Sequence, residues 1–280
     1  MALEDELSDI LKKSRHGQGL SAEQVAQKAA VPPAEVTALE QGERPSHRDR
    51  LAAVARALGL RPDPLAAIAL DNWNPVPTPN IAGIETVRGE IGGYEVKGYI
   101  VHDQGQAVLV DTAYNAPAML ERLAALNVKV VGICLTHGHV DHAGGIDQVL
   151  AQYQVPVYLG DGDEPLLEWH PPKGTLVTPR DGQAIQVGGL SLQCVMTPGH
   201  TPGGICYRID RNTQPVCFVG DTLFAGSIGR SNPASLYPTH LASVRNRVLT
   251  LPEHTVLFPG HGPSTTVREE RSQNPFAASA

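Results

Sequence analysis

The chain has 280 residues, 41% hydrophobic and 18% charged, a balance typical of a globular protein that buries a core. No apolar run approaches the ~20 residues of a membrane span, and the acidic N-terminus lacks the basic and apolar regions of a signal peptide. The net charge of −7 excludes a general attraction to nucleic acid or anionic lipid. The four cysteines lie in apolar runs without Cys-x-x-Cys spacing, so we expect buried free thiols in a cytoplasmic protein without a membrane partner.

The first seventy residues have the pattern of short helices with tight connections. Apolar residues recur at helical spacing over residues 3–11 and again over residues 51–58. Between these stretches, Ser21 and Gln24 form a capping box that predicts the start of one helix. Pro32-Pro33 can begin a further helix, because a missing N–H costs little in the first turn.

These helices resemble the helix-turn-helix module of the Cro/repressor family, and we assign the module to residues 1–72. In that family the second helix of the motif reads base edges with polar or basic side chains. Here that helix opens Pro32-Pro33-Ala34-Glu35, and residues 1–72 carry nine Lys and Arg against eleven Asp and Glu. Because basic groups supply most non-specific DNA affinity, we expect docking or formation of a homodimer rather than DNA binding.

A proline-rich stretch follows the helical module. Alternate prolines in Pro75-Val76-Pro77-Thr78-Pro79 favour an extended linker over residues 73–80. From residue 81 the pattern changes to short β-rich runs, with a hairpin predicted over residues 99–111 and a helix over residues 117–126. The sequence therefore predicts a second domain over residues 81–280.

A histidine-rich string follows the apolar run at residues 130–135. It reads Thr136-His137-Gly138-His139-Val140-Asp141-His142 and precedes a segment with helical spacing, so we predict strand, loop and helix start. Imidazole nitrogens and a carboxylate oxygen that converge on one point suit a divalent transition metal, with zinc as the first choice.

Three further polar residues each follow a predicted strand. The strands are expected over residues 190–196, 205–209, 216–219 and 255–258, with a helix over residues 240–249. His200, Asp221 and His261 come directly after three of these strands, in turns rich in glycine and proline. Two β-rich halves with helices outside them predict an α+β fold, a four-layer αβ/βα sandwich with the metal at the edge where the strands end.

Together these motifs resemble the metallo-β-lactamase superfamily, and within it the glyoxalase II (hydroxyacylglutathione hydrolase) branch, over residues 81–276. The string from Gly220 to Arg230 and the string from Pro259 to Thr266 are the more specific parts. The resemblance implies two divalent metal ions, zinc first, with iron or manganese as alternatives. It implies that His137, His139 and His200 hold the first metal, that Asp141, His142 and His261 hold the second, that Asp221 bridges them, and that Asp111 orients ligands from outside.

The implied chemistry is attack of a metal-bridging hydroxide on a thioester carbonyl, with a thiolate as an easy leaving group. Asp221 and Asp141 are the catalytic carboxylates, and Asp141 could also orient the nucleophile. In glutathione-using relatives the residue matching Arg230 receives a substrate carboxylate. Asn232 stands where those relatives have a tyrosine that helps hold glutathione, and their helical C-terminal extension is absent. The substrate could therefore be another thioester or an ester.

Three other functions compete with a hydroxyacylglutathione-like thioesterase. A glutathione persulfide dioxygenase would use one iron on His137, His139 and Asp221 and leave the second site empty. A lactonase would use the same metal pair. A metabolite-responsive DNA-binding regulator would use the metal domain as a sensor. The string Gly220-Asp221-Thr222-Leu223-Phe224 favours the hydrolase over the dioxygenase.

Overall fold

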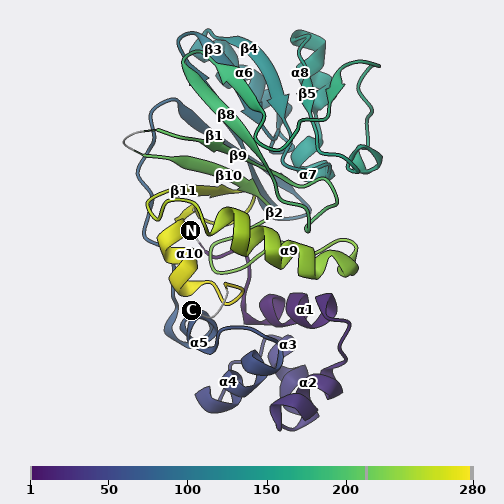
Figure 1. Cartoon of the computed structure of the whole chain (residues 1–280), viewed down its shortest axis with the longest axis vertical. Coiled ribbons are helices and arrows are strands. Elements are labelled where there is room, and N and C mark those ends of the chain that lie inside the picture. Colours follow the sequence, from purple (N-terminus) through teal and green to yellow (C-terminus); the bar gives the residue numbers. More distant parts are fainter. Residues whose placement is uncertain (1, 212–213, 278–280) are drawn as a thin grey trace.

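The computed structural model describes residues 2–211 and 214–277, and it has a helical unit below a two-sheet unit in Figure 1. The helical unit contains α1 (Leu7–Gly17), α2 (Ala22–Ala29), α3 (Pro33–Glu40), α4 (Arg48–Ala57) and α5 (Pro62–Asp71). As predicted, Ser21 caps α2 through a capping box with Gln24. The left-handed conformation of Gly42, with φ of 92°, lets the chain turn away after α3.

The first sheet holds the six strands nearest the N-terminus in sequence order. They are β1 (Ile84–Ile91), β2 (Tyr94–Asp103), β3 (Gln106–Val110), β4 (Lys129–Cys134), β5 (Val157–Tyr158) and β6 (Leu176–Val177). The β1–β2 and β2–β3 pairs are antiparallel, whereas β3 to β6 run parallel. The helices of this half are α6 (Ala116–Leu126), α7 (Val140–Ala143) and α8 (Ile146–Gln152), with a 3-10 turn at Glu164–Leu166.

The second sheet has the order β12-β11-β10-β9-β8-β7. Its strands are β7 (Ala184–Val187), β8 (Leu190–Met196), β9 (Ile205–Ile209), β10 (Val216–Gly220), β11 (Val256–Pro259) and β12 (Thr265–Thr266). Only the β10–β11 pair is parallel among its described pairings. Its helices are α9 (Tyr237–Ser243) and α10 (Val267–Gln273), with a 3-10 turn at Ala234–Leu236. The helix expected over residues 240–249 starts earlier, at Tyr237, and ends in a π-helical turn at Val244–Val248.

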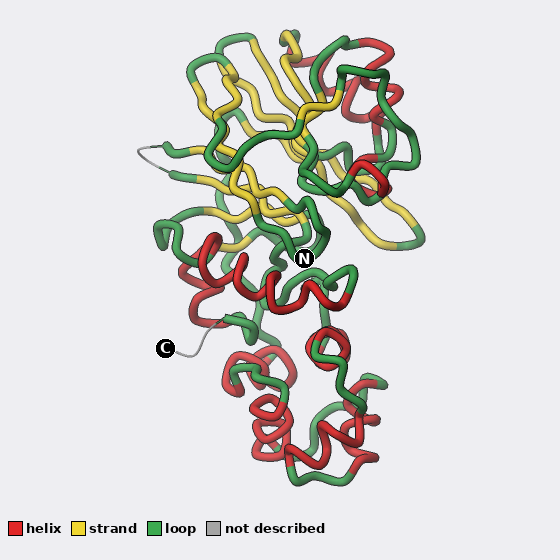
Figure 2. Tube along the Cα trace, turned by 45° about the vertical axis from the view of Figure 1, so that its right-hand side comes forward, coloured by secondary structure: helices red, strands yellow, loops and turns green. Residues whose placement is uncertain are grey.

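The two sheets pack face to face and carry their helices on the outside, as Figures 1 and 2 show. Their shared core includes the tightly grouped rings of Tyr99, Phe218 and Phe258. This arrangement confirms the predicted four-layer α+β sandwich preceded by a small helical module. All four cysteines are buried free thiols, as the sequence predicted. Among the described residues, no helix is both long and apolar enough to cross a membrane.

The helical unit shares one hydrophobic core with the second sheet and its helices. Leu11 and Leu65 from the helical unit belong to the same buried cluster as Ile228 and Val244. A backbone hydrogen bond of 2.9 Å from Arg61 to the carbonyl of Pro275 joins the start of α5 to the segment after α10. The two units are therefore joined by direct packing as well as by the linker.

Candidate metal centre

Sheet register brings the polar loops to one edge of the sandwich. Val110 lies opposite Cys134 in the parallel β3–β4 pair, so Asp111 and the histidine-rich string leave the first sheet side by side. In the second sheet, Gly220 lies opposite Pro259 in the parallel β10–β11 pair. Asp221 and His261 therefore leave the second sheet together, facing the ends of β3 and β4.

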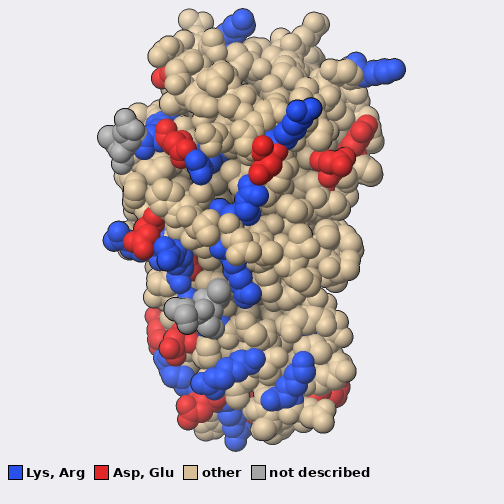
Figure 3. Space-filling model, in the orientation of Figure 1, with Lys and Arg blue, Asp and Glu red and all other residues tan. Residues whose placement is uncertain are grey.

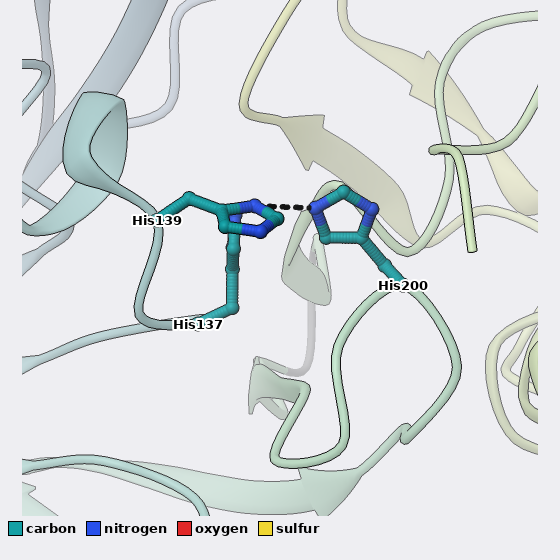
Figure 4. Close-up of side chains that lie close together, drawn as sticks. All are labelled: His137, His139 and His200. Carbon is teal, nitrogen blue, oxygen red and sulfur yellow. Dashed lines mark hydrogen bonds between the residues drawn. The ribbon is translucent and has the colours of Figure 1, made fainter. Parts of the chain in front are cut away.

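His137, His139 and His200 form the first cluster of possible metal ligands, with one ligand atom of each within 4.8 Å of the others. Figure 4 shows the three rings turned toward one another from two loops. His200 Nδ1 lies 2.7 Å from the carbonyl oxygen of Arg230, which directs its Nε2 into the cluster, 3.0 Å from His139 Nδ1. In the described part of the chain, the buried Nε2 of His137 has no hydrogen-bond partner.

Asp141, His142, Asp221 and His261 form the second cluster, again with ligand atoms within 4.8 Å. His142 Nε2 lies 3.2 Å from Asp221 Oδ1, and His261 Nε2 lies 3.2 Å from Asp141 Oδ2. The outer nitrogens are also held: His142 Nδ1 by Asp111, at 2.8 Å, and His261 Nδ1 by the carbonyl oxygen of Glu95, at 2.7 Å. Both imidazoles therefore present Nε2 to the cluster.

Asp221 lies between the two clusters. Its Oδ2 is 3.6 Å from Nε2 of His200 in the first cluster and 3.6 Å from Nε2 of His261 in the second. The carboxylate is buried, and its Oδ1 makes no hydrogen bond to any described residue. The Asp221 carboxylate can thus offer an oxygen atom to each of the two clusters.

The electrostatics of these side chains suit bound cations. Burial lowers the pKa of His137 well below its ordinary value and that of His200 to about 3, so both are neutral imidazoles with a free lone pair at neutral pH. Burial also opposes ionisation of Asp221, but the surrounding histidines, His261 first, outweigh burial and hold its pKa well below the usual range. Five imidazoles, among them His137 with its unpaired Nε2, and two carboxylates fit divalent metals with nitrogen and oxygen ligands.

Asp111 is the predicted orienting residue, and it is fully buried under the site. Its Oδ1 accepts a hydrogen bond from the Thr136 N–H and its Oδ2 accepts one from the Thr136 hydroxyl, both 2.7 Å long. The same Oδ2 faces His142 Nδ1. Asp111 has a left-handed backbone with φ of 56°, a strained conformation of the kind that clusters at functional sites.

Asp163 is a supporting residue that the sequence analysis missed. Its buried carboxylate accepts hydrogen bonds from the Gly138 N–H at 3.1 Å and the Gly203 N–H at 2.7 Å. It also accepts one from the hydroxyl of Thr201, at 2.7 Å. Asp163 therefore joins the loop of His137 and His139 to the loop of His200. It sits among other acidic residues in the string Asp161-Gly162-Asp163-Glu164, and nothing in that string distinguishes it.

The two predicted substrate-binding residues lie beside His200. The Arg230 side chain is exposed, while its carbonyl oxygen faces His200 Nδ1. Asn232 is exposed as well, and its N–H donates to the carbonyl oxygen of His200 at 2.9 Å. The structure places both residues at the rim of the first cluster.

Comparisons with known proteins match both units. A family model described as the metallo-beta-lactamase superfamily matches residues 91–261, and a helix-turn-helix domain model matches residues 6–68. The probable metallo-hydrolase YqgX of Bacillus subtilis is 31% identical over 207 residues, which cover 68% of this chain and 95% of that protein. The hydroxyacylglutathione hydrolase GloC of Haemophilus influenzae is 30% identical over 189 residues, covering 62% of this chain and 88% of that protein.

Solved structures give the same result. The crystal structure of BLEG-1 B3 metallo-beta-lactamase is 30% identical, with a TM-score of 0.61, and covers 69% of this chain and 98% of its own. The structure of TTHA1623 in a di-iron-bound form is 30% identical, with a TM-score of 0.58, covering 68% and 99%. ETHE1 from Myxococcus xanthus is 25% identical, with a TM-score of 0.55, covering 68% and 83%.

Proposed function

This chain belongs to the metallo-beta-lactamase superfamily, and we propose that it is a two-metal hydrolase that cleaves a thioester, most simply a hydroxyacylglutathione-like one. The observation that carries the proposal is the position of Asp221 between two complete ligand clusters. An enzyme with a single metal would need only one of these clusters. The similarity to the hydrolase GloC supports the same reaction class.

Each cluster would hold one metal ion. His137, His139 and His200 would bind the first, Asp141, His142 and His261 the second, and Asp221 would be shared. When bound, a pair of metal ions would lower the pKa of a bound water molecule and polarise a carbonyl oxygen. Because a thiolate leaves easily, with a thiol pKa near 8.5, the reaction needs no strong general acid from the chain.

Asp141 is placed to act on the attacking water. Its side chain is 22% exposed, more than that of any other member of the second cluster, so it is the member most accessible to water. Burial opposes ionisation of Asp141, but His261 and His142 outweigh burial and lower its pKa. The carboxylate therefore stays ionised at neutral pH and can accept a hydrogen bond from water.

A cavity of about 470 Å³ beside α7 offers room for the acyl group. It shares Val140 and Ala143 with the helix that carries Asp141 and His142. Tyr114 and Trp169, 46% and 41% exposed, line this cavity and are two of the four large hydrophobic residues exposed in the described chain. The chain holds Tyr114, which lines the cavity, at φ of 50°, a strained conformation of the kind that clusters at functional sites.

The charges around the two ends of the site differ, which suggests how a substrate lies. Asp147 and Glu168 line the cavity beside α7, so that end disfavours a carboxylate and suits an uncharged acyl group. Arg230 lies at the other cluster and forms no salt bridge within residues 2–211 and 214–277, so it can receive a carboxylate of the thiol portion.

The proposal is tested by metal content together with catalysis. We expect protein purified without a chelator or metal-binding tag to contain two metal equivalents per chain and to release free thiol from lactoylglutathione. His142→Ala should lose one metal equivalent and nearly all activity, whereas His254→Ala, at an exposed histidine outside the site, should change neither. One equivalent of iron, with oxygen consumption on glutathione persulfide and no thioester cleavage, would overturn the hydrolase in favour of a dioxygenase.

A further inference from the structure

Helix α1 and the residues before it contact the loop that carries Arg230. The buried carboxylate of Asp5 accepts hydrogen bonds from the Lys13 ammonium and from the hydroxyl of Ser227. The Lys13 ammonium also donates to the carbonyl oxygen of Ile228, at 2.9 Å. Two charged side chains of the helical unit are thereby fixed to a loop more than two hundred residues later in the sequence.

The same loop lies directly against the metal ligands. The N–H of Gly229 donates to the carbonyl oxygen of Asp221 at 3.0 Å, and the carbonyl oxygen of Arg230 holds His200 Nδ1 at 2.7 Å. A Cβ at Gly229 would lie 2.1 Å from the Asp221 carbonyl oxygen and 2.8 Å from His200 Nδ1. No side chain fits between this loop and the ligands, so a shift of the loop moves His200 or Asp221.

Lys13 also reaches the second cluster through an aromatic ring. Its ammonium lies 4.9 Å from the centroid of the Phe224 ring, within the range of a cation–π interaction. The Phe224 ring in turn meets the ring of His261 edge-on, with centroids 5.7 Å apart. Lys13 is therefore next to residues that support a ligand in each cluster.

We propose that Lys13, held in place by Asp5, is a positioning residue of the metal site, so that the helical unit is part of the hydrolase. The inference about substrate binding rests on the proposed function, but the inference about metal binding does not. Without the Lys13 ammonium, Asp5 is a buried carboxylate without its cation, and the Ile228 carbonyl loses a donor. The loop from Ile228 to Arg230 is then free to shift, taking with it the group that orients His200 and the guanidinium that faces the substrate.

The test compares two adjacent lysines of α1. Lys13→Met removes the part-buried ammonium, and Lys12→Met is the matched control, because Lys12 makes no hydrogen bond or salt bridge to any described residue. Zinc affinity is measured by competition with a chromophoric chelator, and folding is checked by circular dichroism. We expect Lys13→Met to weaken zinc binding roughly tenfold or more, as for other partners that orient metal ligands, and Lys12→Met to stay within twofold.

A kinetic comparison separates positioning from general destabilisation. We expect Lys13→Met to raise KM more for a glutathione thioester than for an uncharged thioester of N-acetylcysteamine, because only the first needs Arg230. Folded Lys13→Met with the zinc affinity and the KM ratio of the wild type would overturn the inference. If the protein binds zinc as described but cleaves no thioester, the proposed function fails while the zinc comparison still decides the role of Lys13.

A second variant covers the case in which Lys13→Met does not fold. Ser227→Ala removes the hydroxyl that links Asp5 to the loop but leaves the Lys13–Asp5 pair intact. We expect a smaller change in the same direction, with zinc binding weakened roughly threefold or more. If Lys13→Met does not fold and folded Ser227→Ala binds zinc as tightly as the wild type, the inference is contradicted.

Discussion

Asp111 Oδ2 and His142 Nδ1 lie 2.8 Å apart beneath the candidate metal centre, and neither side chain is accessible to solvent beyond a few per cent. The carboxylate can only accept at that point, so the proton of a neutral His142 belongs on Nδ1. Its Nε2 then carries the lone pair that faces Asp221 and the second cluster. The relationship fixes both the tautomer and the ring orientation of one proposed metal ligand.

Asp111→Asn should therefore weaken metal binding at the second cluster. If the asparagine NH₂ faces His142 Nδ1, it donates there and the proton of His142 must move to Nε2. If the amide is turned the other way, its NH₂ lies against the N–H of Thr136, so that two donors face each other. We expect roughly 10- to 100-fold weaker binding of one metal equivalent, the usual cost of losing such a partner. Isothermal titration of the metal-free protein with zinc measures both sites. Two equivalents bound as tightly as in the wild type would contradict this role, and Asp147→Asn, at an exposed carboxylate, is the control.

Trp169→Ala tests the assignment of the cavity beside α7 to the acyl group. The indole is 41% exposed at the cavity wall, so its removal should cost little stability. We expect KM to rise about tenfold, ~1.4 kcal/mol, for a thioester with a bulky aromatic acyl group, since a pocket contact of this size is worth about 1–3 kcal/mol. The acetyl thioester should change less than twofold. A uniform effect on both substrates, or none, would place the acyl group elsewhere; Val76→Ala, at an exposed residue of the linker, is the control.

We expect the helical unit not to bind DNA, because its acidic groups neutralise its basic ones. Arg48 pairs with Asp71 at 2.8 Å and Arg50 pairs with Glu35 at 3.0 Å, so acidic groups of the same unit neutralise two arginines of α4. On the face drawn in Figure 3, acidic and basic side chains are interspersed over this unit. We expect no retardation of random genomic fragments at micromolar protein and low salt, where even non-specific binding is detectable.

A double variant tests whether these two ion pairs are what prevents DNA binding. Glu35→Gln in α3 together with Asp71→Asn at the end of α5 removes the acidic partners of Arg50 and Arg48 and frees both arginines. Salt-dependent retardation in this variant alone would support the explanation. Retardation of the wild-type protein would contradict it and favour the DNA-binding regulator.

The clustering of the proposed metal ligands could be predicted from the sequence because each lies in a short string with its own signature. His137, His139, Asp141 and His142 fall within six positions, and Asp221 and His261 follow apolar strands directly. Strand ends in neighbouring positions of a sheet then meet at one edge, as the β10–β11 register shows. The local pattern was enough to predict that these side chains meet, because each of them follows the end of a strand.

The supporting contacts could not be predicted in this way. Asp163 contacts residues 25 to 40 positions away, and Lys13 contacts Ile228 at a separation of 215. Both are ordinary charged residues in polar strings, and only tertiary packing shows that they are buried or part-buried among backbone donors and acceptors. The packing of α1 on the metal-site loop was missed for the same reason, since a proline-rich linker indicates separation but says nothing of contacts.

Glu270 gives the protein a pH-dependent stability that one substitution should remove. Its carboxyl group is fully buried, and burial raises its pKa from 4.5 to about 7. Between these values the unfolded chain releases the proton while the folded chain keeps it, so this group's contribution to stability falls as the pH rises from about 5 to 7. The loss is on the order of 3 kcal/mol at 1.36 kcal/mol per pKa unit.

Glu270→Gln keeps the hydrogen bonds without the charge. The amide oxygen can accept from the Gly226 N–H and the Asn274 amide, and its NH₂ can donate to the Thr265 hydroxyl, which is free to rotate. We expect the variant to be more stable than the wild type at pH 8, with a difference in unfolding free energy that shrinks toward pH 5. Urea unfolding of the metal-free proteins across this range measures it. A difference that does not vary with pH would show that Glu270 ionises normally, and Glu121→Gln, at an exposed carboxylate of α6, should show no trend.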